Sequence, residues 1–249
     1  MEHRTTCSYD GCTRSPWWPG DGKFSGVDAF CIFHSPLSDK KRKEFKEAWE
    51  IFLANTFSDS RTITSLDCAG FIFPVQIELK NLIITGNADF SRTVFRKDAS
   101  FDKTMFASAD FSGARFESDA RFRKSSFAMP AVFKHTEFCD DVSFTNTRFI
   151  DETDFSNVSF FGNAHFTHAH FDGKTIFDDA RFSRFGFFSD INLSCTTITF
   201  GSQSRPYARS KGNNKRTSSH AVFSLSRLWN SFQKRHLKYK SAPILRFFL

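Results

Sequence analysis

The sequence predicts an all-β protein of the solenoid class, in which short strands form successive coils around a phenylalanine core. Three observations support this prediction. The 249 residues include 35 phenylalanines but only three tyrosines and three methionines. The phenylalanines recur at steps of five or six residues through the middle of the chain, and a second register of small residues accompanies them. One apolar residue type at regular intervals is typical of repeat architectures.

The phenylalanine register has eighteen positions and a working period of eleven residues. From Phe116 onward the steps alternate between six and five, as in the segments ESDARFRKSSF and CDDVSFTNTRF. Two residues before each phenylalanine stands a small or β-branched residue: nine Ala, six Thr, two Val and one Ser. Residues two apart share one face of an extended chain, so each repeat directs a large and a small side chain the same way. The phenylalanines stand at positions 90, 95, 101, 106, 111, 116, 122, 127, 133, 138, 144, 149, 155, 160, 166, 171, 177 and 182.

Neither a helix nor a continuous strand buries these phenylalanines on one side. At about 100° per residue in a helix, steps of five and six place successive rings roughly 140° and 240° apart, so no single apolar stripe forms. In an unbroken strand, an odd step sends alternate rings to opposite faces. The chain must therefore turn after every repeat, and segments that turn the same way each time form stacked coils.

The segments ADFSRTVF, ADFSGARF and NAHFTHAHF resemble tandem pentapeptide repeats. The pattern of that family is a small residue, a polar residue, a central Leu or Phe, and two polar or variable positions. The resemblance implies a right-handed, four-sided β-helix with the central and small residues packed inside. Here the central residue is nearly always Phe, and every second face carries one additional residue, a departure that concerns the corners and not the architecture.

The register extends toward both ends, and we assign residues 66–200 to the solenoid. With three more positions on each side, about 24 faces result, or six coils of four, and at roughly 4.8 Å per coil the rod is about 29 Å long. Near the N-terminal end the small register holds the bulky Phe71 and Ile77, as expected at a cap. The added positions are Phe73, Leu79 and Ile84 on one side and Phe188, Leu193 and Ile198 on the other.

Residues 1–36 carry two close pairs of metal-ligating side chains in the pattern C-x4-C-x18-C-x2-H. Paired Cys and His ligands are typical of tetrahedral structural zinc sites. The segments CSYDGC and FCIFH resemble small treble-clef or ribbon-like zinc motifs. We predict a structural zinc ion bound by Cys7, Cys12, Cys31 and His34. Four protein ligands leave no open position for a catalytic water. The alternative is a set of buried or incidental cysteines beside a chance histidine.

Residues 37–60 are predicted to form an amphipathic capping helix, with the helical pattern running from about Asp39 to Thr56. Lysine and glutamate occupy mainly the solvent side of this helix. The apolar side must pack against something, and the first coil is the nearest candidate. The apolar residues on that side are Phe45, Ala48, Trp49, Phe52 and Leu53.

The net charge of +7 is concentrated in a basic tail at residues 201–249. Eleven Lys and Arg and no Asp or Glu lie there, which leaves 23 basic and 27 acidic residues, a net of −4, for residues 1–200. We predict that the tail is partly disordered and contains an amphipathic helix. Capping of the last coil, binding to an anionic membrane surface and contact with nucleic acid are open alternatives for it. The apolar residues at helical spacing are Val222, Leu225, Leu228, Trp229 and Phe232.

The sequence contains no recognisable catalytic constellation, so we predict that the protein is not an enzyme. It has no phosphate-binding glycine loop and no assignable set of Ser, His and Asp. His165, His168 and His170 are predicted to point outward into solvent. There is no run of about 18 apolar residues and no stretch typical of a signal peptide, so we expect a cytoplasmic location.

The leading functional hypothesis is a non-catalytic scaffold that presents its exposed faces to a protein partner, with a homodimer as a further alternative. The family resemblance implies a second hypothesis, a mimic of duplex DNA that inhibits DNA gyrase. Residues 88–200 contain 16 acidic and 13 basic residues, which is too mixed a charge for a phosphate backbone mimic. Association with a membrane surface through the basic tail is a third hypothesis, and a zinc enzyme with an open coordination position is a fourth.

Overall fold

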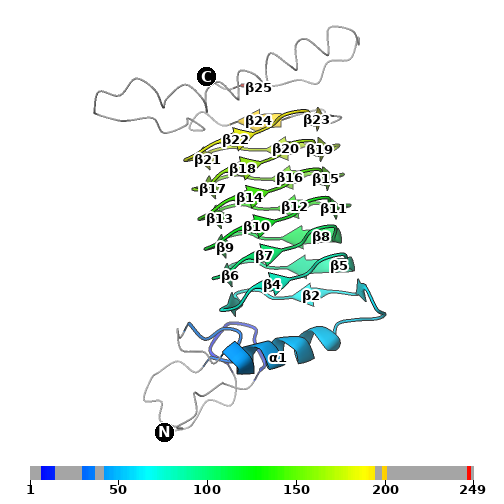
Figure 1. Cartoon of the computed structure of the whole chain (residues 1–249), viewed down its shortest axis with the longest axis vertical. Coiled ribbons are helices and arrows are strands. Elements are labelled where there is room, and N and C mark those ends of the chain that lie inside the picture. The colour runs from blue at the N-terminus through cyan, green and yellow to red at the C-terminus, as the bar shows by residue number, and fades with distance from the viewer. Residues whose placement is uncertain (1–6, 15–29, 37–41, 194–197, 201–245, 248–249) are drawn as a thin grey trace, which may run out of the picture.

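The structure is a computed structural model that describes residues 7–14, 30–36, 42–193, 198–200 and 246–247. Within these ranges the chain forms one helix, α1 (Arg42–Ala54), and 25 short strands in parallel ladders. The strands stack into a four-sided solenoid with α1 across its N-terminal end (Figure 1). The predicted all-β solenoid is confirmed.

Each side of the solenoid is a ladder of strands from successive coils. The first side consists of β3 (Ile72–Phe73), β6 (Val94–Phe95), β9 (Arg115–Phe116), β13 (Glu137–Phe138), β17 (Ser159–Phe160) and β21 (Arg181–Phe182). The second side consists of β4 (Ile77–Glu78), β7 (Ala99–Ser100), β10 (Ala120–Arg121), β14 (Val142–Ser143), β18 (Ala164–His165) and β22 (Gly186–Phe187).

The third and fourth sides are joined into one 13-stranded sheet, because two longer strands, β5 (Ile83–Asp89) and β8 (Met105–Asp110), run across the corner between them. The third side also contains β1 (Thr62–Ile63), β11 (Ser126–Phe127), β15 (Arg148–Phe149), β19 (His170–Phe171) and β23 (Asn192–Leu193). The fourth contains β2 (Leu66–Asp67), β12 (Ala131–Val132), β16 (Thr153–Asp154), β20 (Thr175–Ile176), β24 (Ile198–Phe200) and β25 (Arg246–Phe247). About six coils result, preceded by the half coil β1–β2.

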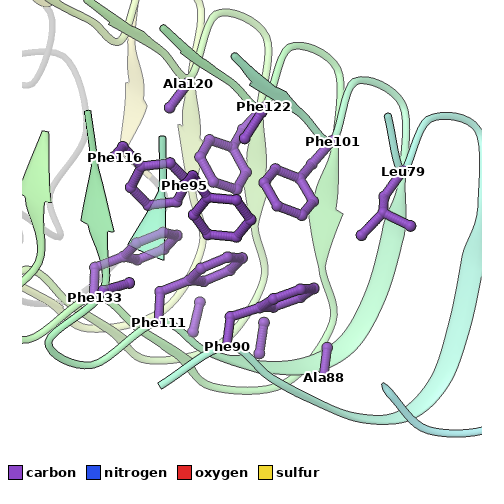
Figure 2. Close-up of a cluster of buried hydrophobic side chains, with 14 of the residues drawn as sticks. Leu79, Ala88, Phe90, Phe95, Phe101, Phe111, Phe116, Ala120, Phe122 and Phe133 are labelled. Carbon is purple, nitrogen blue, oxygen red and sulfur yellow. The ribbon is translucent and has the colours of Figure 1, made fainter. Parts of the chain in front are cut away.

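The core consists of four columns of stacked phenylalanine rings, one column for each side. Rings in successive coils lie nearly parallel, with centroids between 4.6 Å (Phe95 and Phe116) and 5.4 Å (Phe138 and Phe160) apart. Figure 2 shows one column with Phe90 and Phe111. Of the eighteen predicted core phenylalanines, Phe182 is half-buried and the others are buried, as are all eighteen small-register residues.

The eleven-residue period arises from two kinds of corner. At a tight corner, the residue two positions after the core residue has a positive φ, and the next N–H donates back to the core residue's carbonyl, as from Ser125 to Phe122 (3.2 Å). A wide corner contains one more residue. One tight and one wide corner span eleven residues, so the departure from the five-residue pattern produces regular corners. Residues other than Gly with positive φ at tight corners are Asn81, Arg92, Lys103, Lys124, His135, Asn146, Asn157, His168, Asp179 and Asp190.

Threonines in the small register are buried but hydrogen-bonded. The Thr136 hydroxyl donates to the Phe111 carbonyl of the preceding coil (2.8 Å), and the Thr147 hydroxyl donates to the Phe122 carbonyl (2.6 Å). A buried hydroxyl without a partner would cost about 1–3 kcal/mol. These bonds explain why a polar residue is compatible with a position that otherwise holds Ala or Val.

Replacing Lys124 with glycine is expected to stabilise the solenoid by up to about 1 kcal/mol, because Lys124 has a φ of 58° that glycine adopts without strain. The control is Lys134→Gly, since Lys134 is also exposed but is not among the residues with positive φ. That control should lose roughly 0.5–1 kcal/mol. Urea unfolding midpoints measure both effects, and equal destabilisation by the two changes would contradict the corner assignment.

Helix α1 and the N-terminal module, whose described segments are 7–14 and 30–36, pack against the first coil. Phe45 and Trp49 of α1 meet Phe73 edge to face, with ring centroids 5.7 and 4.9 Å apart. Phe33 stacks on Phe71 at 4.6 Å, and its carbonyl accepts a hydrogen bond from the Ile72 N–H (2.7 Å). The module therefore takes the place of a preceding coil, and Phe71 fills the space beneath it.

The forward extension of the core register is wrong at its last position. Ile198 pairs with Thr175 of the small register, so Phe200 aligns with Phe177. Four residues separate β23 from β24, whereas three separate β19 from β20, and this difference shifts the register by one. Toward the N-terminus the register continues beyond the prediction, because Leu66 pairs with Ala88 and Cys68 is therefore equivalent to Phe90.

The predicted tail lies almost entirely outside the described residues, as does its amphipathic helix. Within it the structure describes β25, which pairs in parallel with β24.

His165, His168 and His170 are half-buried or exposed on the outside of the solenoid, in agreement with the prediction. Among the described residues, no helix has the length and apolar character needed to cross a membrane.

Candidate metal centre

The four predicted ligands converge at the N-terminal end of the solenoid. Cys7 and Cys12 lie on the segment 7–14, and Cys31 and His34 lie on the segment 30–36. The N–H of His34 donates to the Cys31 carbonyl (3.1 Å) and the N–H of Cys12 donates to the Tyr9 carbonyl (3.0 Å), so each pair lies on a tight turn. The structure thus brings together all four residues, whose candidate ligand atoms lie within 4.8 Å of one another.

The spacing of these atoms suits a single four-coordinate ion. His34 Nδ1 lies 3.3 Å from Cys31 Sγ and 3.5 Å from Cys7 Sγ, and the sulfurs of Cys12 and Cys31 are 3.9 Å apart. In a tetrahedral site with Zn–S bonds of about 2.3 Å, neighbouring ligand atoms are roughly 3.5–3.8 Å apart. Cys7, Cys31 and His34 are buried and Cys12 is half-buried, so an ion here would be largely shielded from water.

The surroundings of His34 fix which of its ring nitrogens faces the sulfurs. Its Nε2 lies 2.9 Å from the Ala69 carbonyl oxygen, which only accepts hydrogen bonds, so Nε2 carries the proton. Nδ1 then presents its lone pair to the cysteines, as a metal-ligating histidine requires. The Tyr9 ring stacks on the imidazole at 4.0 Å and covers Gly70, where a Cβ would lie 2.2 Å from the tyrosine ring. The site is therefore tied directly to the first coil.

The thiols differ in their acidity. Burial, together with the nearby Cys7 and Cys12, raises the pKa of Cys31 to about 12. Burial also acts to raise the pKa of Cys12, but hydrogen bonds from the backbone and side chain of Arg14 outweigh it and lower that pKa. The Cys7 sulfur accepts hydrogen bonds from the N–H groups of Cys31 (3.2 Å) and Tyr9 (3.5 Å). N–H donors of this kind orient the sulfur of a metal ligand.

Bound metal is expected to leave the protein on acidification, because protons compete with the ion for the thiolates and the imidazole. Without metal, the contribution of Cys31 to stability has the opposite pH dependence: it is lost as the pH rises. Its folded pKa of about 12 exceeds the ordinary value of 9.0, so its contribution to stability is present below pH 9 and is lost as the pH rises toward 12. Titration of the protein loaded with cobalt, followed by thiolate-to-metal absorption, measures the first effect. Absorption that stays constant down to pH 3 would contradict thiolate ligation.

The remaining described cysteines do not join this centre. Cys68 is buried in the core in the position equivalent to Phe90, and Cys139 is half-buried on the side of the solenoid. Sequence reasoning missed three residues of the site, Tyr9, Arg14 and Gly70. Tyr9 lies within the CSYDGC segment, but no feature of the sequence indicated that its ring covers His34.

A family model for pentapeptide repeats, in nine copies, matches residues 80–126 and 133–181. These two segments are pentapeptide repeats. The matched residues of this pentapeptide-repeat solenoid cover its second to fifth coils almost completely and exclude the metal-ligand cluster and α1. No curated protein and no solved structure gave a significant match to the chain.

Proposed function

We propose that this pentapeptide-repeat protein is a non-catalytic scaffold that binds a protein partner along its outer surface, with a structural zinc ion stabilising its N-terminal end. The parallel register of the coils supports this proposal most directly. Arg115 pairs with Glu137, and Glu137 with Ser159, so that outward side chains from successive coils form straight rows. Such rows on a solenoid form an extended binding surface whose positions are set by the core.

The charges along these rows favour a protein partner over mimicry of DNA. Arg115 forms an ion pair with Glu137 of the next coil, Arg121 with Asp98 (2.8 Å) and Arg148 with Asp172 (2.8 Å). These pairs are partly exposed, so each contributes about 0–1 kcal/mol to stability. Each pair neutralises a carboxylate that a DNA mimic would have to present as part of a continuous negative surface.

Apolar side chains interrupt the polar outer surface at one corner. Met105, Met129 and Ile150 belong to three successive coils and are 53%, 54% and 42% exposed. The N–H of Met129 donates to the Ala107 carbonyl (2.7 Å), so its position is fixed by the coil beneath. Exposed apolar side chains in neighbouring positions are typical of contact surfaces.

The chemistry of the ligand set supports zinc. Three cysteines and one histidine form a set common in structural zinc sites, and all four coordination positions would be filled by the protein. Metal binding at such a site contributes directly to folding. A structural role also suits the location, since Phe33, two residues from Cys31, stacks on Phe71 of the first coil.

Affinity capture with cross-linking, using the full chain as bait, tests the scaffold proposal. Two variant baits are compared with the wild-type chain. The first carries serine in place of Met105, Met129 and Ile150, and the second carries serine in place of the exposed Lys124 and Lys134. A partner captured reproducibly by the wild-type chain and lost with one of the two variants, at an unchanged melting temperature, would support the proposal. Capture of no partner, or of the same proteins with all three baits, would contradict it, as would turnover of a small-molecule substrate.

A further inference from the structure

Arg14 connects the metal-ligand cluster to the solenoid. Its Nη1 donates to Cys12 Sγ at 3.8 Å, and its backbone carbonyl accepts a hydrogen bond from the N–H of Cys7 (2.9 Å). The same guanidinium lies over the rings of Phe33, Phe52 and Phe71, at 5.4, 5.1 and 5.1 Å from their centroids. Arg14 therefore contacts a ligand sulfur and three aromatic rings, which come from the segment 30–36, α1 and the first coil.

The charge of the ligand set provides a physical reason for the contact between Arg14 and the Cys12 sulfur. Three thiolates and a neutral imidazole around a divalent ion carry a net charge of about −1. A largely buried charge is costly unless an opposite charge compensates it. The Arg14 guanidinium supplies one positive charge and a charge-assisted N–H···S hydrogen bond at Cys12. Its desolvation is offset by the faces of the three aromatic rings.

We propose that Arg14 is a positioning residue for zinc: it neutralises the zinc–thiolate centre and holds that centre against the first coil. This inference rests on the proposed zinc site. A lysine would supply the charge but could not donate in a plane while stacking on the aromatic rings as arginine does. A methionine would retain much of the apolar packing and remove the charge. The two substitutions therefore separate the effect of charge from that of packing.

Competition between the full-length protein and a chromophoric zinc chelator tests the proposal. Arg14→Met should weaken zinc binding about 10- to 100-fold, as is typical for the loss of a residue that supports a metal ligand, and Arg14→Lys should recover a large part of the loss. The control is Arg96→Met, since Arg96 also joins the N-terminal module to the solenoid, by a hydrogen bond to the Pro36 carbonyl (3.0 Å), but lies outside the ligand set. Its zinc affinity should remain within about twofold of wild type.

The possible outcomes are distinct. Wild-type affinity in Arg14→Met would overturn the role of Arg14 and leave the zinc site standing. Equal losses in Arg14→Met and Arg14→Lys would show that restoring the positive charge does not restore zinc binding, and would overturn charge compensation. Failure of the wild-type chain to bind zinc would remove both the site and this inference. The absorption spectrum of bound cobalt provides a second readout, since an unchanged tetrahedral spectrum at saturation shows that Arg14→Met retains the four ligands.

Discussion

Replacing Phe144 with aspartate is expected to unfold the central coils of the solenoid. The Phe144 ring is fully buried and stacks between Phe122 and Phe166, with both centroids 5.0 Å away. Loss of a buried phenylalanine costs about 3–5 kcal/mol, and a carboxylate in its place adds an uncompensated buried charge. The sum approaches the whole stability of a typical domain, about 5–15 kcal/mol. Circular dichroism and thermal melting measure the loss.

Phe161→Asp is the matched control for this change. Phe161 directly follows the core residue Phe160, but its side chain is 47% exposed. The same substitution should therefore alter stability by no more than about 0.5 kcal/mol. Unchanged circular dichroism and melting temperature in Phe144→Asp would show that the inward register has been assigned wrongly.

Replacing Cys31 with serine is expected to abolish zinc binding and to unfold the N-terminal module. Cys31 is 2% exposed, and its sulfur lies 3.3 Å from His34 Nδ1 and 3.9 Å from Cys12 Sγ. Structural zinc sites contribute an apparent binding free energy of about 10–16 kcal/mol at neutral pH, much of which becomes folding free energy. Zinc content and hydrogen exchange should show the loss in segments 7–14 and 30–36, with the central coils still protected.

Cys139→Ser is the control for the metal ligand, since Cys139 lies outside the ligand cluster. This variant should bind zinc like the wild-type chain and keep the exchange protection of the N-terminal module. A Cys31→Ser protein that retained a full equivalent of zinc with wild-type affinity would contradict the assignment of Cys31 as a ligand.

Most of the fold could be predicted from the sequence because one physical requirement is repeated in every coil. Each side of a coil needs one large and one small inward side chain, and this requirement leaves a period that sequence alone reveals. The failure at Ile198 has the same origin. A period predicts a position only while the spacing between strands is constant, and one additional residue before β24 aligns Phe200 rather than Ile198 with Phe177.

The candidate site could be predicted only as far as its ligands. The two pairs of ligands are close in sequence, and their spacing suits a tetrahedral ion. Tyr9 and Arg14 acquire their roles from contacts with distant residues, Tyr9 with Gly70 and Arg14 with Phe71. No local pattern encodes such contacts. Even Gly70 stands at a tight corner, where equivalent positions hold Arg92 or Lys103, so its small size is explained by Tyr9.

The zinc content of the native chain, purified without chelators and measured by mass spectrometry of the metal, is the most direct test of the capped solenoid. Four protein ligands around one ion predict about one equivalent of zinc per chain, lost when Cys31 is replaced. A content below about half an equivalent in the folded wild-type protein would contradict the zinc-stabilised cap.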